Sequence, residues 1–461
     1  MVKTASLPSL AQALAHLVPA PLLSDEDEGA NSRRRTFFLQ RTFWCFLWQT
    51  LGAQRACRDA VLQVKALCAL ESNAVISSDT GAYVAARQRL PLVRLQAIFA
   101  SLAETAARKA EGIRGARGRR ILAVDATTIQ LPDTADLQAH YPQPPVQKPG
   151  CGFPIMKISA LFNLASGALE RVELGNRKIH ELPLFFRLLA HLSPGDIWLG
   201  DALYCAYIGL AHSLRQGVDG IARLEGPRLT DFRHGRKLGR HERLITWSKP
   251  LYKPHYLSAR QWADIPETLT LRLIRVTVCR PGWRSFSFLV VTTLLDSRAY
   301  PPAWIAELYL RRWRLELCFR DLKTSLGMEM LRTQSVAMAK KEVFMFLIAH
   351  NMIRCLVTEA ARRHDLPVET ISFMGTVAAA RQYCHALALA RNRQTRQRLR
   401  EAFLDAIAQE ALPCRPNRVE PRAVKRRPKP FPRLLISHRE FHARQGVRKQ
   451  PRAKRIGYWA P

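Results

Sequence analysis

Two short apolar runs, each followed by an aspartate, constrain the fold of this chain most strongly. Residues 121–124 read ILAV and precede Asp125, and residues 197–200 read IWLG and precede Asp201. Such runs are typical of strands that are buried on both faces in an α/β sheet. Because the carboxyl ends of these strands open into a crevice, we expect Asp125 at the end of its strand. We expect Asp201 just before a helix that begins near Tyr204.

The residues between the two runs predict a hairpin followed by a helix. Strand signals at 155–164 and 168–174 are separated by Ser166 and Gly167, which fit a tight turn. A helical pattern at 179–192 then leads to the second apolar run. The predicted order is three antiparallel strands, a helix, a strand and a helix, which defines a mixed α/β domain.

A third feature is the segment YLRRWRLELCFRDLK at 309–323. In a helix, Tyr309, Arg312, Glu316 and Lys323 would project within about 60° of one another. An apolar stripe adjoins this row: Leu308, Leu315, Phe319, Leu322 and Leu326. We expect one helix that presses its stripe into a core and leaves the polar row on the rim of a cleft. The alternative is a solvated helix in which Glu316 pairs with its basic neighbours.

The charge of the chain predicts a polyanionic partner. Its 461 residues include 71 Lys and Arg against 37 Asp and Glu, a formal net charge of +34. This excess favours binding to the phosphate backbone of nucleic acid. An anionic membrane is the other candidate, but we see no apolar run of eighteen or more residues and no signal peptide.

The absence of two kinds of motif argues against a zinc site and a nucleotide site. The ten cysteines form no C-x2-C pair and no Cys/His cluster of zinc spacing, so we expect reduced thiols in a cytosolic protein. The chain has no Walker A sequence, and we expect no nucleotide cofactor.

The spacing Y-x2-R-x3-E-x6-K in 309–323 resembles the signature of the insertion-sequence-four family of DDE transposases. The preceding SFLVVTTLLDSRAYPPAWIAELYLRRW is similar to the strand and loop that lead into that helix, and EVFMFLIAHNMIRCLV is similar to the family's next helix. The settings of Asp125 and Asp201 match those of the family's first two acids. The resemblance implies an RNase H-like fold in which Asp125, Asp201 and Glu316 are catalytic and bind metal.

The resemblance also implies an activity and its partners. Two Mg²⁺ ions, with Mn²⁺ as a substitute, would support cutting of transposon ends and joining of those ends to target DNA. Tyr309, Arg312 and Lys323 would hold DNA phosphates. A homodimer on double-stranded DNA and a cytoplasmic, nucleoid-associated location are expected by the same analogy, as is a hairpin intermediate.

Three alternatives stay open at this point. Asp125 and Asp201 also fit N-caps or turn residues after strands, which aspartate commonly provides. The chain could be a DNA-binding regulator or a decayed copy that has lost catalysis. It could also be an RNase H-like nuclease that does not join strands.

The interval between Asp201 and Glu316 is too long for one connection. Its segments LITWSKPLYK, LTLRLIRVTVCR and SFSFLVVTT are rich in β-branched and aromatic residues, and we interpret them as an insertion with its own sheet. Members of the family carry such an insertion, where a tryptophan holds a flipped base. Phe288 takes that place here, with Trp247 and Trp283 as other candidates for stacking on DNA.

Five segments follow from these patterns. Residues 1–115 form a helical N-terminal domain, for which we expect DNA binding. Residues 116–224 form the first part of the catalytic core, 225–295 the β-rich insertion and 296–395 the second part with the signature helix. Residues 396–461 form a basic tail that we expect to be disordered without DNA.

Two further features have competing interpretations. The segment SSDTGAYVAARQRLP, with Arg87 and Arg89, is similar to a segment ahead of the family's catalytic core that suggests binding of transposon ends, but an ordinary basic helix explains it equally well. His180 and Glu181 could border the active site, although a glutamate in the first turn of a helix is favoured by the helix dipole alone.

Overall fold

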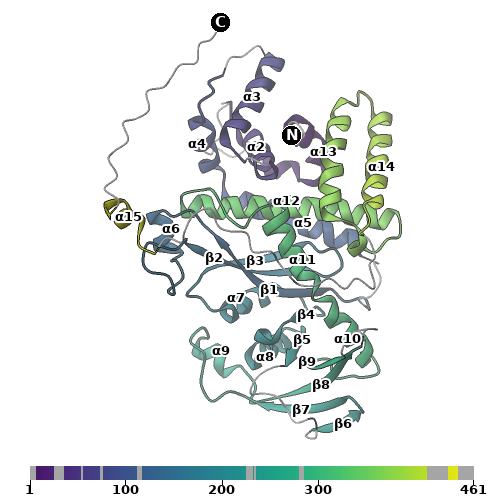
Figure 1. Ribbon diagram of the computed structural model, residues 1–461. Coiled ribbons are helices and arrows are strands. Elements are labelled where there is room, and N and C mark those ends of the chain that lie inside the picture. The colour runs from purple at the N-terminus through teal and green to yellow at the C-terminus, as the bar shows by residue number, and fades with distance from the viewer. Residues whose placement is uncertain are drawn as a thin grey trace.

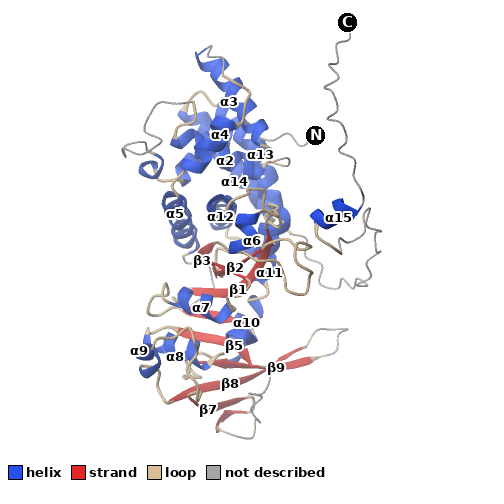
Figure 2. Cartoon of the chain, turned by 90° about the vertical axis from the view of Figure 1, so that its left-hand side faces the viewer, coloured by secondary structure: helices blue, strands red, loops and turns tan. Residues whose placement is uncertain are grey.

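The computed structural model describes residues 7–24, 36–52, 55–72, 76–111, 117–224, 232, 235–279, 285–412 and 435–444. A body of helices lies at one end of the molecule, and a long twisted sheet extends from it (Figures 1 and 2). The strands are β1 Ile121–Gln130, β2 Ile155–Asn163, β3 Leu169–Asn176, β4 Ile197–Gly200, β5 Asp219–Leu224, β6 Arg236–Gly239, β7 Glu242–Ser248, β8 Thr268–Val278 and β9 Phe286–Thr292.

Helices precede, separate and follow these strands along the chain. The α-helices are α1 Leu7–Leu14, α2 Leu39–Leu51, α3 Cys57–Ser72, α4 Gly81–Arg89, α5 Leu92–Ala110, α6 Ala135–His140, α7 Glu181–Leu189, α8 Tyr207–Arg215, α9 Ala259–Ala263, α10 Pro302–Arg311, α11 Arg314–Arg320, α12 Val336–Arg363, α13 Phe373–Leu389, α14 Arg393–Gln409 and α15 His438–Arg444. Short helical turns are η1 Ala15–Leu17, η2 Ala20–Leu23, η3 Ala202–Tyr204, η5 Asp321–Ser325 and η6 Val368–Thr370.

One sheet runs through the described residues in the order β3-β2-β1-β4-β5-β9-β8-β7-β6. The strands β1, β2, β3 and β4 follow in the predicted order, with β1 antiparallel to β2, β2 antiparallel to β3, and β1 parallel to β4. The hairpin, the helix α7 and the strand before Asp201 are therefore confirmed. The described residues form a mixed α/β protein with a large mixed sheet, as the sequence predicted.

The predicted end of the first strand was wrong. Asp125 lies in the middle of β1, because β1 continues to Gln130 through pairing with β2. Its pairing with β4 stops at Ala123, opposite Leu199. The edge of β1 that faces β4 is thus released just before Asp125.

The insertion does not form a separate sheet, and this expectation was also wrong. Strand β9 pairs antiparallel with β5 from Ile221–Thr292 to Leu224–Leu289, so the insertion strands extend the core sheet. The physical reason is that pairing with β9 satisfies the backbone hydrogen-bonding groups along the open edge of β5. Inside the insertion, buried Arg272 pairs with Glu242 and donates to the carbonyl of Tyr300 at 2.8 Å.

Alternate residues of the central strands face two different cores. Ile121 and Ala123 of β1 belong to the core that contains α12, whereas Leu122 and Val124 belong to the core that contains Phe185 of α7. This alternation is the two-residue period of a strand. The odd-numbered side of β1 therefore faces the helical body.

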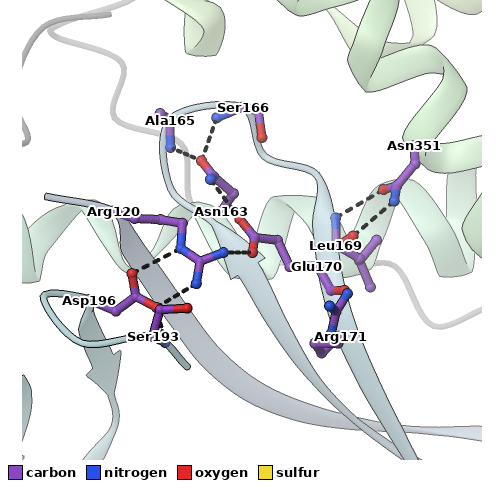
Figure 3. Close-up of polar contacts among 10 residues, drawn as sticks. All are labelled: Arg120, Asn163, Ala165, Ser166, Leu169, Glu170, Arg171, Ser193, Asp196 and Asn351. Carbon is purple, nitrogen blue, oxygen red and sulfur yellow. Dashed lines mark hydrogen bonds and ion pairs between the residues drawn. The ribbon is translucent and has the colours of Figure 1, made fainter. Parts of the chain in front are cut away.

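A polar network connects the starts of β1, β3 and β4 (Figure 3). Arg120 donates from Nε to Asp196 at 2.9 Å and from Nη1 to Glu170 at 2.7 Å. Asn351 of α12 brackets Leu169 by accepting from its N–H at 2.9 Å and donating to its carbonyl at 2.8 Å. These contacts tie the starts of β1 and β4 to the β2–β3 turn and to the long helix.

Helix α12 is the centre of the helical body. Among the described residues it alone is long and apolar enough to cross a membrane, yet 94% of its most apolar window is buried inside the protein. It packs against α5 through Phe99 and Phe344, whose ring centroids lie 5.7 Å apart. Its apolar character is thus explained by burial in a core.

The predicted start of the disordered tail was wrong. Residues 396–409 belong to α14, which packs on α12 and α13 through the buried residues Phe403, Leu404 and Ile407. These apolar residues recur at helical spacing and bury one side of a helix that is otherwise highly basic. Residues 413–434 and 445–461 of the predicted tail lie outside the described residues.

The signature segment is not one continuous helix. Helix α10 ends at Arg311, α11 begins at Arg314, and η5 is a turn of π-helix. The two helices lie on different strands, since α10 packs on β5 and α11 packs on β1. Between them, the N–H groups of Arg312 and Trp313 bond to the carbonyls three residues back, at Tyr309 and Leu310, although both residues keep right-handed helical backbone angles.

Candidate active site

Asp125 and Asp201 lie side by side at the centre of the sheet. Parallel pairing places Ala123 opposite Leu199, and each aspartate follows its paired residue by two positions. The alternation of β1 directs Asp125 to the face that carries the helical body. The sequence therefore brought two of the three predicted acids to one place.

The electrostatic environment of Asp125 reflects this proximity. Burial, assisted by the nearby charges of Asp201 and Glu181, raises the pKa of Asp125 to about 6. Its own hydrogen bond from the N–H of Ala126, at 2.8 Å, and the charge of Arg312 act in the opposite direction. The aspartate is thus a half-buried carboxylate beside other carboxylates, which is typical of a functional site.

Asp201 also has the local role that was left open. Its Oδ1 accepts a hydrogen bond from the N–H of Leu203 at 2.8 Å, which caps η3. The cap engages one carboxylate oxygen and fixes the side chain in position. The capping interpretation is therefore correct for Asp201, and it does not conflict with a role in the site.

Glu181 lies at the same site. It begins α7, where His180 is the N-cap and accepts from the N–H of Leu182. Its charge acts on both Asp125 and Tyr204, and burial together with the charges of Asp125, Glu181 and Asp201 raises the pKa of Tyr204. Of the two interpretations of Glu181, the structure favours a position on the border of the site.

Two cations and an aromatic ring from the signature segment line one side of the candidate site. The guanidinium of Arg312 lies 5.7 Å from the ring centre of Tyr309, and both side chains are buried. Lys323 reaches β1 from η5, and its Nζ donates to Thr127 at 3.4 Å. Tyr309, Arg312 and Lys323 therefore border the aspartates, although they come from α10, the turn that follows it and η5.

Glu316 is not gathered with the two aspartates. It is exposed on α11. Within the described parts of the chain, no three His, Cys, Asp or Glu side chains form a group that could hold a metal ion. The tightened turn at Arg312 and Trp313 interrupts the regular helical spacing between Tyr309 and Glu316 on which the predicted direction of Glu316 depended.

Phe288 lies beside the signature residues, where the sequence placed its candidate. Its ring centre is 5.6 Å from that of Tyr309 and 6.0 Å from that of Phe286. Trp247 packs against the other core, on the far face of the sheet from Phe288. Trp283 lies outside the described residues.

Arg223 is a site residue that the sequence analysis missed. Its guanidinium lies 5.4 Å from the ring centre of Phe288, and its charge acts on Tyr309. In β5 it lies two residues after Ile221, which faces the helical body. The two side chains therefore lie on the same face of the strand. Counting alternate residues in the strand VDGIARL could have placed it on the same face as the two aspartates.

Arg87 has a structural position. It is buried on α4, donates to Gln49 at 3.0 Å and lies over the rings of Phe46 and Tyr83. An arginine enclosed in this way is not available to DNA in this arrangement. Binding of transposon ends by this segment stays a prediction for its exposed residues.

Comparison with known proteins identifies the family of this chain. A family model described as the transposase DDE domain matches residues 116–352, which is just over half of the chain. The chain therefore belongs to the DDE transposase family. The DDE segment spans the core strands, the insertion and the signature helices.

A named relative places the chain more narrowly. It is 23% identical over 412 residues to the transposase InsG for insertion sequence element IS4 of Escherichia coli (strain K12), covering 87% of this chain and 88% of that protein. The predicted insertion-sequence-four family of DDE transposases is thus confirmed. Among solved structures, a piggyBac transposase synaptic complex with hairpin DNA matches 88% of this chain and 85% of its own, at 8% identity and a TM-score of 0.40.

Proposed function

We propose that Asp125, Asp201 and Glu316 form the catalytic centre with which this DDE transposase cuts the ends of an insertion sequence and joins them to target DNA. The observation that carries the proposal is the adjacency of Asp125 and Asp201 on the sheet face that Arg312 and Lys323 border. Its DNA partner follows from the transposase family.

The residues present fit divalent metal ions. Burial and the charge of Asp201 raise the pKa of Asp125, and a cation between these carboxylates would relieve both effects. Carboxylates are the ligands that Mg²⁺ prefers. Asp125 and Asp201 would hold the metal, and Glu316 would complete the set when α11 turns toward them. Bound as a pair, Mg²⁺ ions, or Mn²⁺ in their place, would polarise the phosphodiester and activate the attacking group.

The other side chains would position DNA. Arg312 offers the forked geometry that phosphate prefers, and Lys323 adds a point charge near Thr127. Tyr309 would steady the same phosphates, and Phe288 would stack on a base displaced beside the cut. We further propose a homodimer that brings two transposon ends together, without a nucleotide cofactor, at the nucleoid in the cytoplasm.

Replacement of each acid tests this proposal. Asp125→Asn, Asp201→Asn and Glu316→Gln keep the side-chain shape but lose the charge that holds metal. We expect each variant to bind a synthetic transposon end but to lose Mg²⁺-dependent cleavage by at least about 10³-fold, because binding alone does not supply the chemistry. Glu329→Gln, which changes an exposed glutamate that follows η5, is the control and should cleave normally.

Each outcome separates the competing functions. Full cleavage by a variant would remove that residue from the catalytic centre. Wild-type protein that binds ends without cutting them would be a regulator or a decayed copy. Cutting without joining to target DNA would identify a nuclease.

A further inference from the structure

A cavity of about 310 Å³ lies behind the helix that carries Glu316. We call it the α11 cavity; its walls come from α11, η5, the β2–β3 turn, α12 and the start of α13. Its lining includes neither Asp125 nor Asp201. The volume falls at the lower end of the range of about 300–1,000 Å³ in which small molecules bind.

The walls of the α11 cavity are largely apolar and aromatic. Phe162 and Phe373 line it, and both rings are buried. Leu317 of α11 also lines it, although 43% of this apolar residue is exposed. A flat apolar body inserted between these side chains would cover surface that water now reaches.

A buried arginine in the α11 cavity has an unsatisfied donor. Arg354 of α12 is only 8% exposed; its Nη2 donates to Asp321 at 2.9 Å, and its guanidinium lies 5.3 Å from the ring centre of Phe373. Its Nε has no hydrogen-bond partner among the described residues. A buried N–H without an acceptor is costly, which favours a ligand that brings an acceptor.

The charges around the α11 cavity leave a positive excess. Arg314 pairs with Glu369 at 2.6 Å, and Asp321 is paired with Arg354. Arg320, which is exposed and also lines the cavity, has no ion pair within the described part of the chain. The two carboxylates of the lining are therefore engaged, whereas one guanidinium is available for an anion.

One wall of the α11 cavity is fixed by hydrogen bonds. Asn163 lines the cavity and accepts from the N–H groups of Ala165 at 2.9 Å and Ser166 at 3.1 Å (Figure 3). Its Nδ2 donates to Glu170 at 2.8 Å. A wall held in this way is formed before a ligand arrives, which reduces the entropy lost on binding.

We propose that the α11 cavity is a binding site for a small aromatic carboxylate. The apolar body would lie between Phe162 and Phe373, and the carboxylate would accept from Arg354 and Arg320. Such a ligand would contact the helix that carries Glu316, so its binding would stabilise the present position of α11.

The test uses full-length protein and two probes of the same shape. Calorimetric titration with 2-naphthoate should show saturable binding at one site. The neutral 2-naphthamide should bind at least about tenfold more weakly, because hydrogen bonds from arginine to a carboxylate are stronger than those to a neutral amide. No saturable binding of naphthoate, or equal binding of both probes, would overturn the proposal.

Three variants locate the site, each checked for a native circular dichroism spectrum. Met374→Trp replaces an unbranched side chain of the cavity wall, 44% exposed, with a large ring, and should abolish binding. Arg320→Gln should weaken naphthoate binding by about tenfold, the value of one charged hydrogen bond. Arg398→Gln, an exposed cation of α14 outside the lining, should leave binding unchanged. Equal losses in the two arginine variants would show attraction to net charge alone and refute the site.

Discussion

At the scale of single residues, the charge of Asp125 is the most informative feature. A half-buried carboxylate beside Asp201 and Glu181 is held in its charged form at a cost to stability, which its raised pKa expresses. Catalytic sites often keep such unfavourable charges because they bind a cation or substrate. Arg223 belongs to the same group, since its charge faces Tyr309 and its guanidinium lies against Phe288.

The raised pKa predicts how stability depends on pH. The pKa of Asp125 is about 6 in the folded protein against 3.8 ordinarily, so folded protein holds this proton more tightly. The contribution of Asp125 to stability is therefore fully present below the ordinary value and is lost as pH rises through about 6. In chelator-treated protein we expect Asp125→Asn to raise the free energy of unfolding by about 1–3 kcal/mol above pH 7, with almost no gain near pH 4.

Urea unfolding at the two pH values measures this difference. The exposed Asp133→Asn is the control and should show no comparable dependence on pH. An equal effect of Asp125→Asn at both pH values would mean that the charge of this carboxylate is not what the substitution relieves. Added Mg²⁺ should stabilise the wild type and not the Asp125→Asn protein.

At the scale of elements, the broken signature segment decides how the site is assembled. Helix α10 carries Tyr309, the tightened turn that follows it carries Arg312, and the π-turn η5 carries Lys323. Turns of π-helix occur frequently at functional sites. Buried Asp321 begins η5, and its ion pair with Arg354 holds this turn against α12.

A double substitution distinguishes phosphate contacts of Arg312 and Lys323 from a role as ordinary surface charges. If Arg312 and Lys323 hold phosphates, changing both to Gln should slow single-turnover cleavage of a synthetic end by about 10²-fold or more, because a displacement of about 1 Å has that effect. If they only decorate the surface, stability should fall by about 1 kcal/mol or less and cleavage should be unchanged. Arg398→Gln provides a charge-matched control for each substitution, and thermal unfolding checks the fold. Near-normal cleavage by the double variant would exclude the phosphate role.

The Asp321–Arg354 pair should be important for stability. Asp321→Asn removes the charge that compensates a buried guanidinium, and losing one partner of such a pair costs about 3–5 kcal/mol. We expect a loss in this range, measured by urea unfolding. Arg363→Gln, which breaks the more exposed pair with Asp405, should cost about 1 kcal/mol or less. Similar losses in both variants would contradict the role assigned to burial.

At the scale of the whole molecule, one sheet joins the core strands and the insertion strands, which the sequence predicted to form separate sheets. The insertion strands continue the core through β9, and the helices near both ends of the chain pack around α12. The full chain has a formal net charge of +34. DNA binding should therefore contain a strong component that does not depend on base sequence.

Removing the basic residues after Leu412 tests that component. The end point is well placed, because the N–H of Leu412 bonds to the carbonyl of Thr370 and α14 stays complete. We expect weaker DNA binding at low salt and a flatter plot of log affinity against log salt. Each lost phosphate contact reduces the slope by about 0.9. An unchanged slope in a salt titration would mean that these residues do not contact DNA.

The sequence by itself determined the core strands, helix α7 and the positions of two of the acids after apolar runs. Apolar runs before Asp125 and Asp201, the hairpin signals and the signature spacing depend on neighbouring residues, and local patterns report them well. Tyr309, Arg312 and Lys323 were placed at the site by the same spacing. Phe288 lies beside Tyr309 in a strand that the sequence predicted, and its stacking on DNA stays a prediction.

Only the tertiary structure decided the rest, because it depends on contacts between distant segments. Pairing with β2 extended β1 past Asp125, and pairing of β9 with β5 merged the insertion into one sheet. Helix α10 packs on β5 and α11 on β1, the hydrogen bonding of the signature segment breaks between them, and Glu316 is exposed on α11. Packing on α12 and α13 ordered the basic α14. The residue pattern within one segment does not indicate which distant segment will pair with it or pack on it. The position of Glu316 and the neighbours of Asp125 were therefore decided by the fold.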